Sequence, residues 1–173
     1  MTGRFQRCTG YARAMHRPCT ALAFLLWAAV AQAQTLEEAR DLMEAGQFEE
    51  ARTLFELFAR SGNADAEELI GVMYAMGLGV ERDDLRAFDW YLRASLKGHP
   101  GAQSGLGWYY EVGRGLPAPD LVRAYLWYAL SAIGGDVDAP DSLAEVRLRM
   151  TPEEIAKAEV LVEDYRGWMY PFR

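Results

Sequence analysis

The chain has 173 residues, with 18 Lys and Arg against 25 Asp and Glu and a formal net charge of −7. This acidic balance argues against nucleic acid and against anionic membrane surfaces as partners, because both attract surfaces rich in Lys and Arg. A chain of this length is sufficient for one domain with its own core, and no linker or low-complexity tract divides it.

The first 33 residues have the features of a secretory signal peptide. Four arginines occur there without an acidic residue, followed by the apolar run 21–31 and the small-residue motif Ala31-Gln32-Ala33. We therefore expect cleavage after Ala33, a mature chain over 34–173, and a periplasmic or secreted location in a bacterium. An uncleaved anchor is the alternative, but eleven apolar residues fall short of the roughly twenty that span a bilayer. No membrane insertion is expected after cleavage.

Removing this segment changes the composition of the mature chain. Both cysteines, Cys8 and Cys19, would be lost, so stability would come from packing without disulfides. The net charge would become −11, with fourteen basic against twenty-five acidic residues. His99 would be the one remaining histidine, which excludes a zinc site built on a pair of histidines and leaves one candidate general base. We expect His99 to be a solvated, structurally neutral loop residue.

Apolar residues at three- and four-residue steps predict helices throughout the mature chain. Thr35 and Glu38 have the capping-box spacing, which predicts a helix over 36–45. Gly46 would end it, and a second helix is expected over 47–60. Further helices are expected over 64–76, 83–97, 101–112 and 120–133.

The segment 71–79 recurs thirty-six residues later as 107–115. The recurring residues are Gly71, Tyr74, Gly77 and Gly79, which return as Gly107, Tyr110, Gly113 and Gly115, and then Ala87, Trp90, Tyr91 and Gly98, which return after thirty-seven residues as Ala124, Trp127, Tyr128 and Gly135. A fixed period in this range indicates stacked supersecondary units. Asp83 and Asp120 stand at corresponding positions, where a carboxylate would cap the following helix.

This order of residues resembles the Sel-one-like repeat (SLR), a relative of the tetratricopeptide repeat (TPR) with a longer inter-helix loop. The first copy reads Ala66, Ile70-Gly71, Tyr74, Gly77-Leu-Gly79-Val80, Asp83, Ala87, Trp90-Tyr91, Ala94 and Gly98, and the second departs at Leu116, at one inserted residue and at Ser131. The resemblance implies an all-α fold, a short right-handed α–α superhelix of about four helical hairpins. Its parts would be a TPR-like hairpin over 35–62, repeat 1 over 64–99, repeat 2 over 100–135, a degenerate capping hairpin over 136–168 and an aromatic tail over 169–173.

Proteins similar to this are mostly adaptors that hold a partner on the concave surface lined by the first helix of each pair. We therefore expect an exported, non-catalytic protein–protein interaction module of the bacterial cell envelope, a monomer or weak oligomer without cofactor, metal or catalytic residue. Its partner would be a protein or peptide of the envelope. The alternative is an accessory enzyme or regulator that acts on cell-wall peptides or sugars. The Ser-x-x-Lys motif is missing, and Gly77-Leu-Gly79 lacks the rest of a phosphate loop.

The candidate binding residues surround Trp108. On the helix expected over 101–112, Ala102, Leu106 and Tyr110 form one stripe at four-residue steps. With a period of 3.6 residues, Trp108 points roughly away from this stripe. Its counterpart in repeat 1 is Val72, and the residues expected near it are Tyr109, Glu111 and Arg114. Two interpretations stay open: an apolar strip on the concave face that binds the partner, or packing of Trp108 against a helix expected over 140–149.

The tail brings a second aromatic cluster, Trp168-Met-Tyr-Pro-Phe172. It either folds back to cover the last hairpin or contacts a partner. Because the end of a solenoid has to be closed, folding back is the favoured interpretation.

Overall fold

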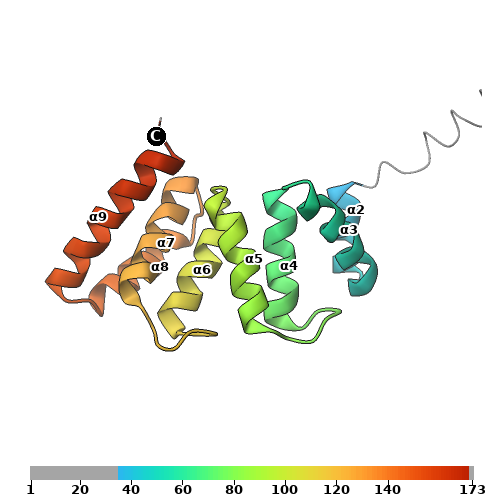
Figure 1. Cartoon of the computed structure of the whole chain (residues 1–173), viewed down its shortest axis with the longest axis horizontal. Helices are drawn as coiled ribbons and strands as arrows, with labels where there is room; N and C mark the ends of the chain where they lie inside the picture. Colours follow the sequence, from blue (N-terminus) through green and yellow to red (C-terminus); the bar gives the residue numbers. More distant parts are fainter. Residues whose placement is uncertain (1–34, 172–173) are drawn as a thin grey trace, which may run out of the picture. The chain divides into compact units, whose positions relative to one another are not determined.

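The computed structural model describes residues 35–171, which lie within one compact unit over 34–173. The predicted signal peptide and Phe172 of the tail lie outside the described residues. The described part forms eight helices and no strand. In chain order (Figure 1) the helices are α2 (Leu36–Glu44), α3 (Phe48–Arg60), α4 (Ala64–Met76), α5 (Asp84–Leu96), α6 (Pro100–Val112), α7 (Leu121–Gly134), α8 (Ala139–Leu148) and α9 (Pro152–Met169).

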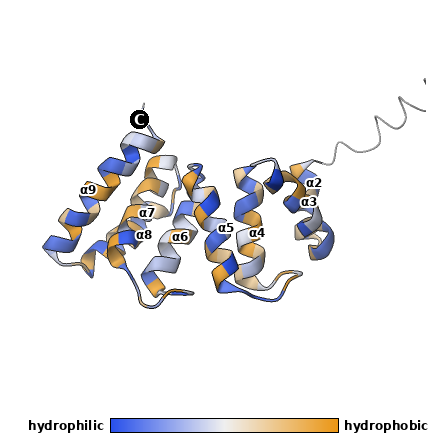
Figure 2. Ribbon diagram, in the orientation of Figure 1, coloured by the Kyte–Doolittle hydropathy of each residue, from blue (hydrophilic) through white to orange (hydrophobic). Residues whose placement is uncertain are grey.

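Each helix from α2 to α7 packs against the next one along the chain, which is the arrangement of a helical solenoid. The prediction of an all-α array is therefore confirmed. The last two helices differ from the expected hairpin, because α8 and α9 each pack mainly on α7 rather than on each other. Covered from several sides, α7 has every residue from 124 to 131 buried, and Figure 2 shows it as largely hydrophobic.

The helix ends follow the sequence signals. The Asp83 carboxylate accepts hydrogen bonds from the backbone N–H groups of Leu85 and Arg86, at 3.1 and 3.0 Å, and so caps α5. Asp120 caps α7 in the same way through the N–H of Arg123. Gly77 ends α4 with a φ of 72°, in the left-handed region that favours glycine. The recurring residues therefore set the register of the two repeats.

Small residues allow neighbouring helices to approach closely. A Cβ atom added to Gly107 of α6 would lie 2.9 Å from Cδ1 of Tyr128 on α7, and one added to Gly71 of α4 would lie 3.1 Å from Cδ1 of Tyr91 on α5. Both tyrosine rings are almost completely buried. The recurring glycine and the recurring tyrosine therefore form one contact, made once in each repeat.

One carboxylate is fully buried in this core. Glu67 of α4 has no exposed side-chain surface, and its two oxygens lie 2.7 Å from Arg93 Nη2 on α5 and 2.6 Å from Nζ of Lys97, the residue after α5. The Arg93 guanidinium also lies 4.2 Å from the centre of the Trp90 ring. Because an unpaired buried carboxylate is strongly destabilising, the two cations are what makes this burial tolerable.

Gly107→Ala is expected to lower the free energy of unfolding by about 2 kcal/mol, because the new methyl group would overlap a buried ring. Gly167→Ala on α9 is the matched control, since nothing lies within 4 Å of its added Cβ. Ala is a better helix former than Gly, so this change is expected to raise the free energy of unfolding by about 0.5 to 1 kcal/mol. Urea denaturation measures both values, and shifts of the same sign would contradict the packing argument.

Candidate functional site

Exposed apolar side chains occupy corresponding positions on α4 and α6. Met76 is 69% exposed, Trp108 is 40% exposed and Val112 is 46% exposed, while Val72 is partly buried against the core. Val72 and Met76 precede Trp108 and Val112 by thirty-six residues each. We call these four residues the α4–α6 face.

Trp108 is held from two sides. Its ring lies edge-to-face on Tyr109, with centroids 5.4 Å apart, and the Arg114 guanidinium lies 5.5 Å from its centre. Two interpretations were open for this side chain, and its exposure is the feature that an apolar strip requires. A role of Trp108 in binding stays a prediction.

Arg114 connects the two repeats. Its Nε lies 2.9 Å from Asp84 Oδ2 at the start of α5, and both side chains are less than one third exposed. The neighbouring Gly115 lies close to Leu85, which is 63% exposed. Arg114 therefore positions the loop after α6 and the Trp108 ring at once, and Leu85 extends the apolar surface beside them.

Tyr109 is not at the surface, which corrects its place among the expected binding residues. It is 1% exposed, with its ring between Phe88 and Tyr91 at centroid distances of 6.2 and 5.7 Å. Burial, followed by the charge of Asp84, raises the pKa of its hydroxyl to about 12. Successive residues on a helix point about 100° apart, so the rotation that exposes Trp108 turns Tyr109 towards α5.

Glu111 is partly exposed, but its carboxylate is already bound by other residues of the protein. Its carboxylate accepts a hydrogen bond from the Tyr128 hydroxyl at 2.9 Å and forms an ion pair with Arg149. Burial, followed by this hydrogen bond, raises the pKa of Tyr128 above its ordinary value. Glu111 therefore ties α6 to α7 and to the residue after α8, which is a structural role.

Sequence reasoning missed Glu68, which precedes Val72 by one turn of α4. The pKa of its carboxyl is raised from an ordinary 4.5 to about 7, mainly by burial and next by the charge of Asp65, against the opposing charge of Arg40. A carboxyl that resists ionisation beside the α4–α6 face is chemically distinctive. Its four-residue step to Val72 was the only signal in the sequence.

His99 has a structural role rather than the neutral one expected of it. Its Nδ1 accepts the N–H of Ala102 at 3.1 Å and so caps α6, and its Nε2 lies 3.4 Å from Asp65 Oδ1. Burial lowers the pKa of His99, against the opposing charge of Asp65. An imidazole that accepts at Nδ1 carries its proton on Nε2. His99 is thus held as a neutral cap.

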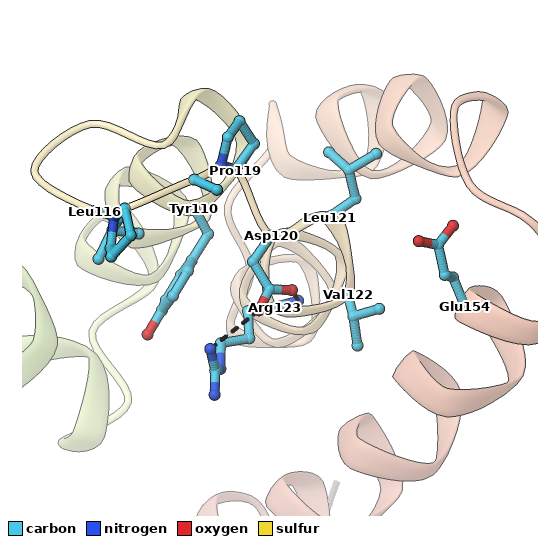
Figure 3. A pocket seen from close by; sticks show the side chains of 10 residues that line it. Tyr110, Leu116, Pro119, Asp120, Leu121, Val122, Arg123 and Glu154 are labelled. Atoms are coloured by element: carbon cyan, nitrogen blue, oxygen red, sulfur yellow. Dashed lines mark hydrogen bonds and ion pairs between the residues drawn. The ribbon is translucent and has the colours of Figure 1, made fainter.

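Two hollows of the surface lie at the inter-helix loops of the two repeats. Figure 3 shows the cavity beside the loop before α7, of about 620 Å³, where Arg123 is paired with Asp120 at 3.0 Å. The Arg123 guanidinium also lies 5.6 Å from the Tyr110 ring centre. Repeat 1 has the same arrangement of a tyrosine, a capping aspartate and an arginine. There Tyr74, Asp83 and Arg86 line a cavity of about 470 Å³. In both repeats the arginine is neutralised by the capping aspartate.

Two negative findings bound the chemistry of residues 35–171. This part of the chain contains no group of three or more His, Cys, Asp or Glu residues arranged to hold a metal ion. None of its helices is long and apolar enough to cross a membrane.

Comparison with known proteins identifies the repeated unit. Residues 64–99 and 100–136 match the family model described as Sel1 repeat. The crystal structure of c5321, a protective antigen present in uropathogenic Escherichia coli strains that displays an SLR fold, aligns with 88% of this chain and 34% of its own at a TM-score of 0.73 and 22% identity. At this identity the likeness shows the fold alone.

Two curated relatives are similar in sequence. HRD3B of Arabidopsis thaliana, a component of an ERAD-associated E3 ubiquitin-protein ligase, is 34% identical over 64% of this chain and 19% of its own length. The alginate biosynthesis protein AlgK of Azotobacter vinelandii is 29% identical over 60% of this chain and 22% of its own length. The chain spans between 12% and 22% of the curated relatives it matches.

The raised pKa of Glu68 predicts a stability that falls as pH rises. Between about pH 4.5 and 7 the folded protein holds this proton and the unfolded chain releases it, so the free energy of unfolding decreases across that window. Glu68→Gln removes the effect, and relative to the parent it is expected to gain about 2 to 3 kcal/mol between pH 4.5 and pH 8. Urea denaturation across this range, with Glu50→Gln as the control for a lost surface charge, measures the gain. A difference that does not change with pH would contradict the assignment.

Proposed function

The chain carries two Sel1 repeats within a TPR-like helical array, and from this premise we propose that it is an exported, non-catalytic adaptor of the bacterial cell envelope. The α4–α6 face binds a protein or peptide segment of another envelope component. The Sel1 repeat is a protein-interaction module, which supports binding as the general activity. The site, the partner class and the location are the finer parts of the proposal.

The observation that carries the proposed site is the exposure of Trp108 together with its fixed position. A tryptophan that is 40% exposed in the free protein still has a large apolar area to bury against a partner, and tryptophan is enriched among the residues that dominate binding energies. Contacts with Tyr109 and Arg114 hold its ring, so less conformational entropy is lost on binding.

The charges around this face favour an apolar contact over an ionic one. Arg114 is paired with Asp84, and Glu111 is paired with Arg149. Breaking either pair would cost part of what a new ion pair gains. Val112 follows Trp108 by one turn of α6, and Met76 holds the corresponding position on α4; neither side chain carries a charge. The partner therefore presents apolar side chains to this face.

The assignment to the envelope rests on the N-terminal sequence. A basic region, the apolar run 21–31 and the motif Ala31-Gln32-Ala33 have the order found in secretory signal peptides. No cysteine follows Cys19. The mature chain therefore cannot form incorrect disulfides, which makes it compatible with folding in an oxidising compartment.

A second candidate is an accessory enzyme or regulator that acts on cell-wall peptides or sugars. The similarity to AlgK, named for alginate biosynthesis, is the observation that favours it. Here the acidic surface of the chain would contact a cationic or polar substrate. The two candidates differ in what the isolated protein binds, a protein segment in the first and a cell-wall polymer in the second.

Trp108→Ala is expected to weaken binding of the envelope partner at least tenfold, because a central aromatic side chain would be lost. Trp168→Ala is the matched control, since Trp168 is 62% exposed and lies on α9. An affinity pull-down from an envelope extract, followed by titration of the purified partner, measures the change. Equal affinity of the parent and both variants would exclude the α4–α6 face.

The same preparations separate the two candidates. Under the second one, the purified protein alone would sediment with peptidoglycan or an exported polysaccharide, or would modify it. Such binding would depend on surface carboxylates and would survive Trp108→Ala. Under the adaptor proposal, the polymer retains none of the purified protein.

A further inference from the structure

A polar slot recurs at the two junctions between helical pairs. At the first junction the slot consists of the Gly62 carbonyl, in the loop before α4, and the Glu67 carboxylate. The Lys97 ammonium fills it, with Nζ at 3.0 Å from Gly62 O and 2.6 Å from Glu67 Oε2. Lys97 directly follows α5, so repeat 1 supplies its own donor.

Thirty-six residues later the same slot takes its donor from elsewhere. Gly98 and Gln103 correspond to Gly62 and Glu67. The Tyr170 hydroxyl lies 3.3 Å from Gly98 O and 3.1 Å from Gln103 Oε1. A phenol from the segment after α9 therefore occupies the place that the lysine ammonium holds in the first junction.

Repeat 2 has no side chain that could fill its own slot. The residue that corresponds to Lys97 is Gly134, thirty-seven positions later. A Cβ atom added to Gly134 would lie 2.9 Å from Pro100 Cγ and 3.2 Å from the Tyr170 hydroxyl oxygen. The space that a side chain at this position would need is thus already taken by the ring of Pro100 and by Tyr170.

The orientation of the Gln103 amide makes the slot an acceptor of hydrogen bonds. The residue is fully buried, and its Nε2 donates to Ser95 O at 3.2 Å, which turns Oε1 towards Tyr170. Without a donor this buried oxygen would be unsatisfied, which is destabilising. The two junctions are also matched in charge: an ammonium meets a carboxylate in the first, and a neutral phenol meets a neutral amide in the second.

We infer that the slot formed by Gly98, Gln103 and Gly134 is a binding site for a tyrosine phenol, which Tyr170 occupies in cis, and that this contact latches α9 onto the second repeat. The neighbouring Met169 contributes its sulfur, 3.6 Å from Gln103 Nε2. The latch adds to the packing of α9 on α7, where the Tyr165 ring also lies edge-to-face on Trp127. It also fixes one wall of a cavity of about 410 Å³ between α9 and the helices α5 and α7.

The latch is tested in the full-length chain by tryptic cleavage after Arg166, in the last turn of α9. Tyr170→Phe deletes only the hydroxyl and is expected to speed this cleavage about threefold to tenfold, because the loss of one buried hydrogen bond raises the population of the released end. Tyr165→Phe on α9 is the matched control: the Tyr165 ring lies edge-to-face on Trp127 of α7, and cleavage is expected at the parent rate. Equal rates for Tyr170→Phe and the parent would overturn the inference.

A second variant tests the correspondence of the two junctions. Pro100→Ala, Gln103→Glu and Gly134→Lys together reproduce the first junction, where Ala64, Glu67 and Lys97 stand at these positions. The introduced ammonium is expected to take the slot and release Tyr170, so that cleavage after Arg166 speeds up at least as much as in Tyr170→Phe while helical circular dichroism is kept. A folded triple variant that protects Arg166 as well as the parent would overturn the inference. If the triple variant does not fold, the comparison of Tyr170→Phe with Tyr165→Phe decides by itself.

Discussion

The array depends on a tyrosine ring held between glycines of two consecutive first helices. Cβ atoms added to Gly71 of α4 and to Gly105 of α6 would each lie 3.1 Å from the ring of Tyr91. The ring belongs to α5, which is the helix that stands between them. Repeat 1 and repeat 2 are thus joined through one aromatic plane, and the close approach of three helices fixes how the second repeat is placed on the first.

Around this apolar contact the two repeats solve the burial of a polar side chain differently. Glu67 is neutralised by cations of its own repeat, whereas Gln103 is satisfied by Ser95 and by a residue beyond the last helix. The ion pairs of Glu67 need no residue from outside the first repeat. The neutral hydrogen bond makes the second junction depend on the residue after α9, which ties the end of the array to its middle, while α8 packs mainly on α7 and reaches α9 through the Arg147–Glu159 ion pair.

The α4–α6 face depends on the same helix rotations as the core. Because α6 turns Leu106 and Tyr109 inward to meet α5 and α7, Trp108 is left facing outward. The surface charges next to it are already used within the protein, by Asp84 on one side and Arg149 on the other. Under the proposed function, the part left for a partner is an apolar surface, and the buried centre of protein interfaces is apolar in the same way.

The sequence alone determined the helices, the aspartate caps of α5 and α7 and the period of the repeat, because hydrophobic periodicity, capping residues and glycines act over short stretches and are visible in a linear string. It also singled out Trp108. Only the tertiary structure decided which neighbours share its surface. Tyr109 turned inward, Glu111 was taken by Tyr128 and Arg149, and Tyr170 reached a slot sixty-seven residues away at Gln103. Contacts of that kind leave no periodic trace, because they depend on the close packing of helices that are distant in sequence.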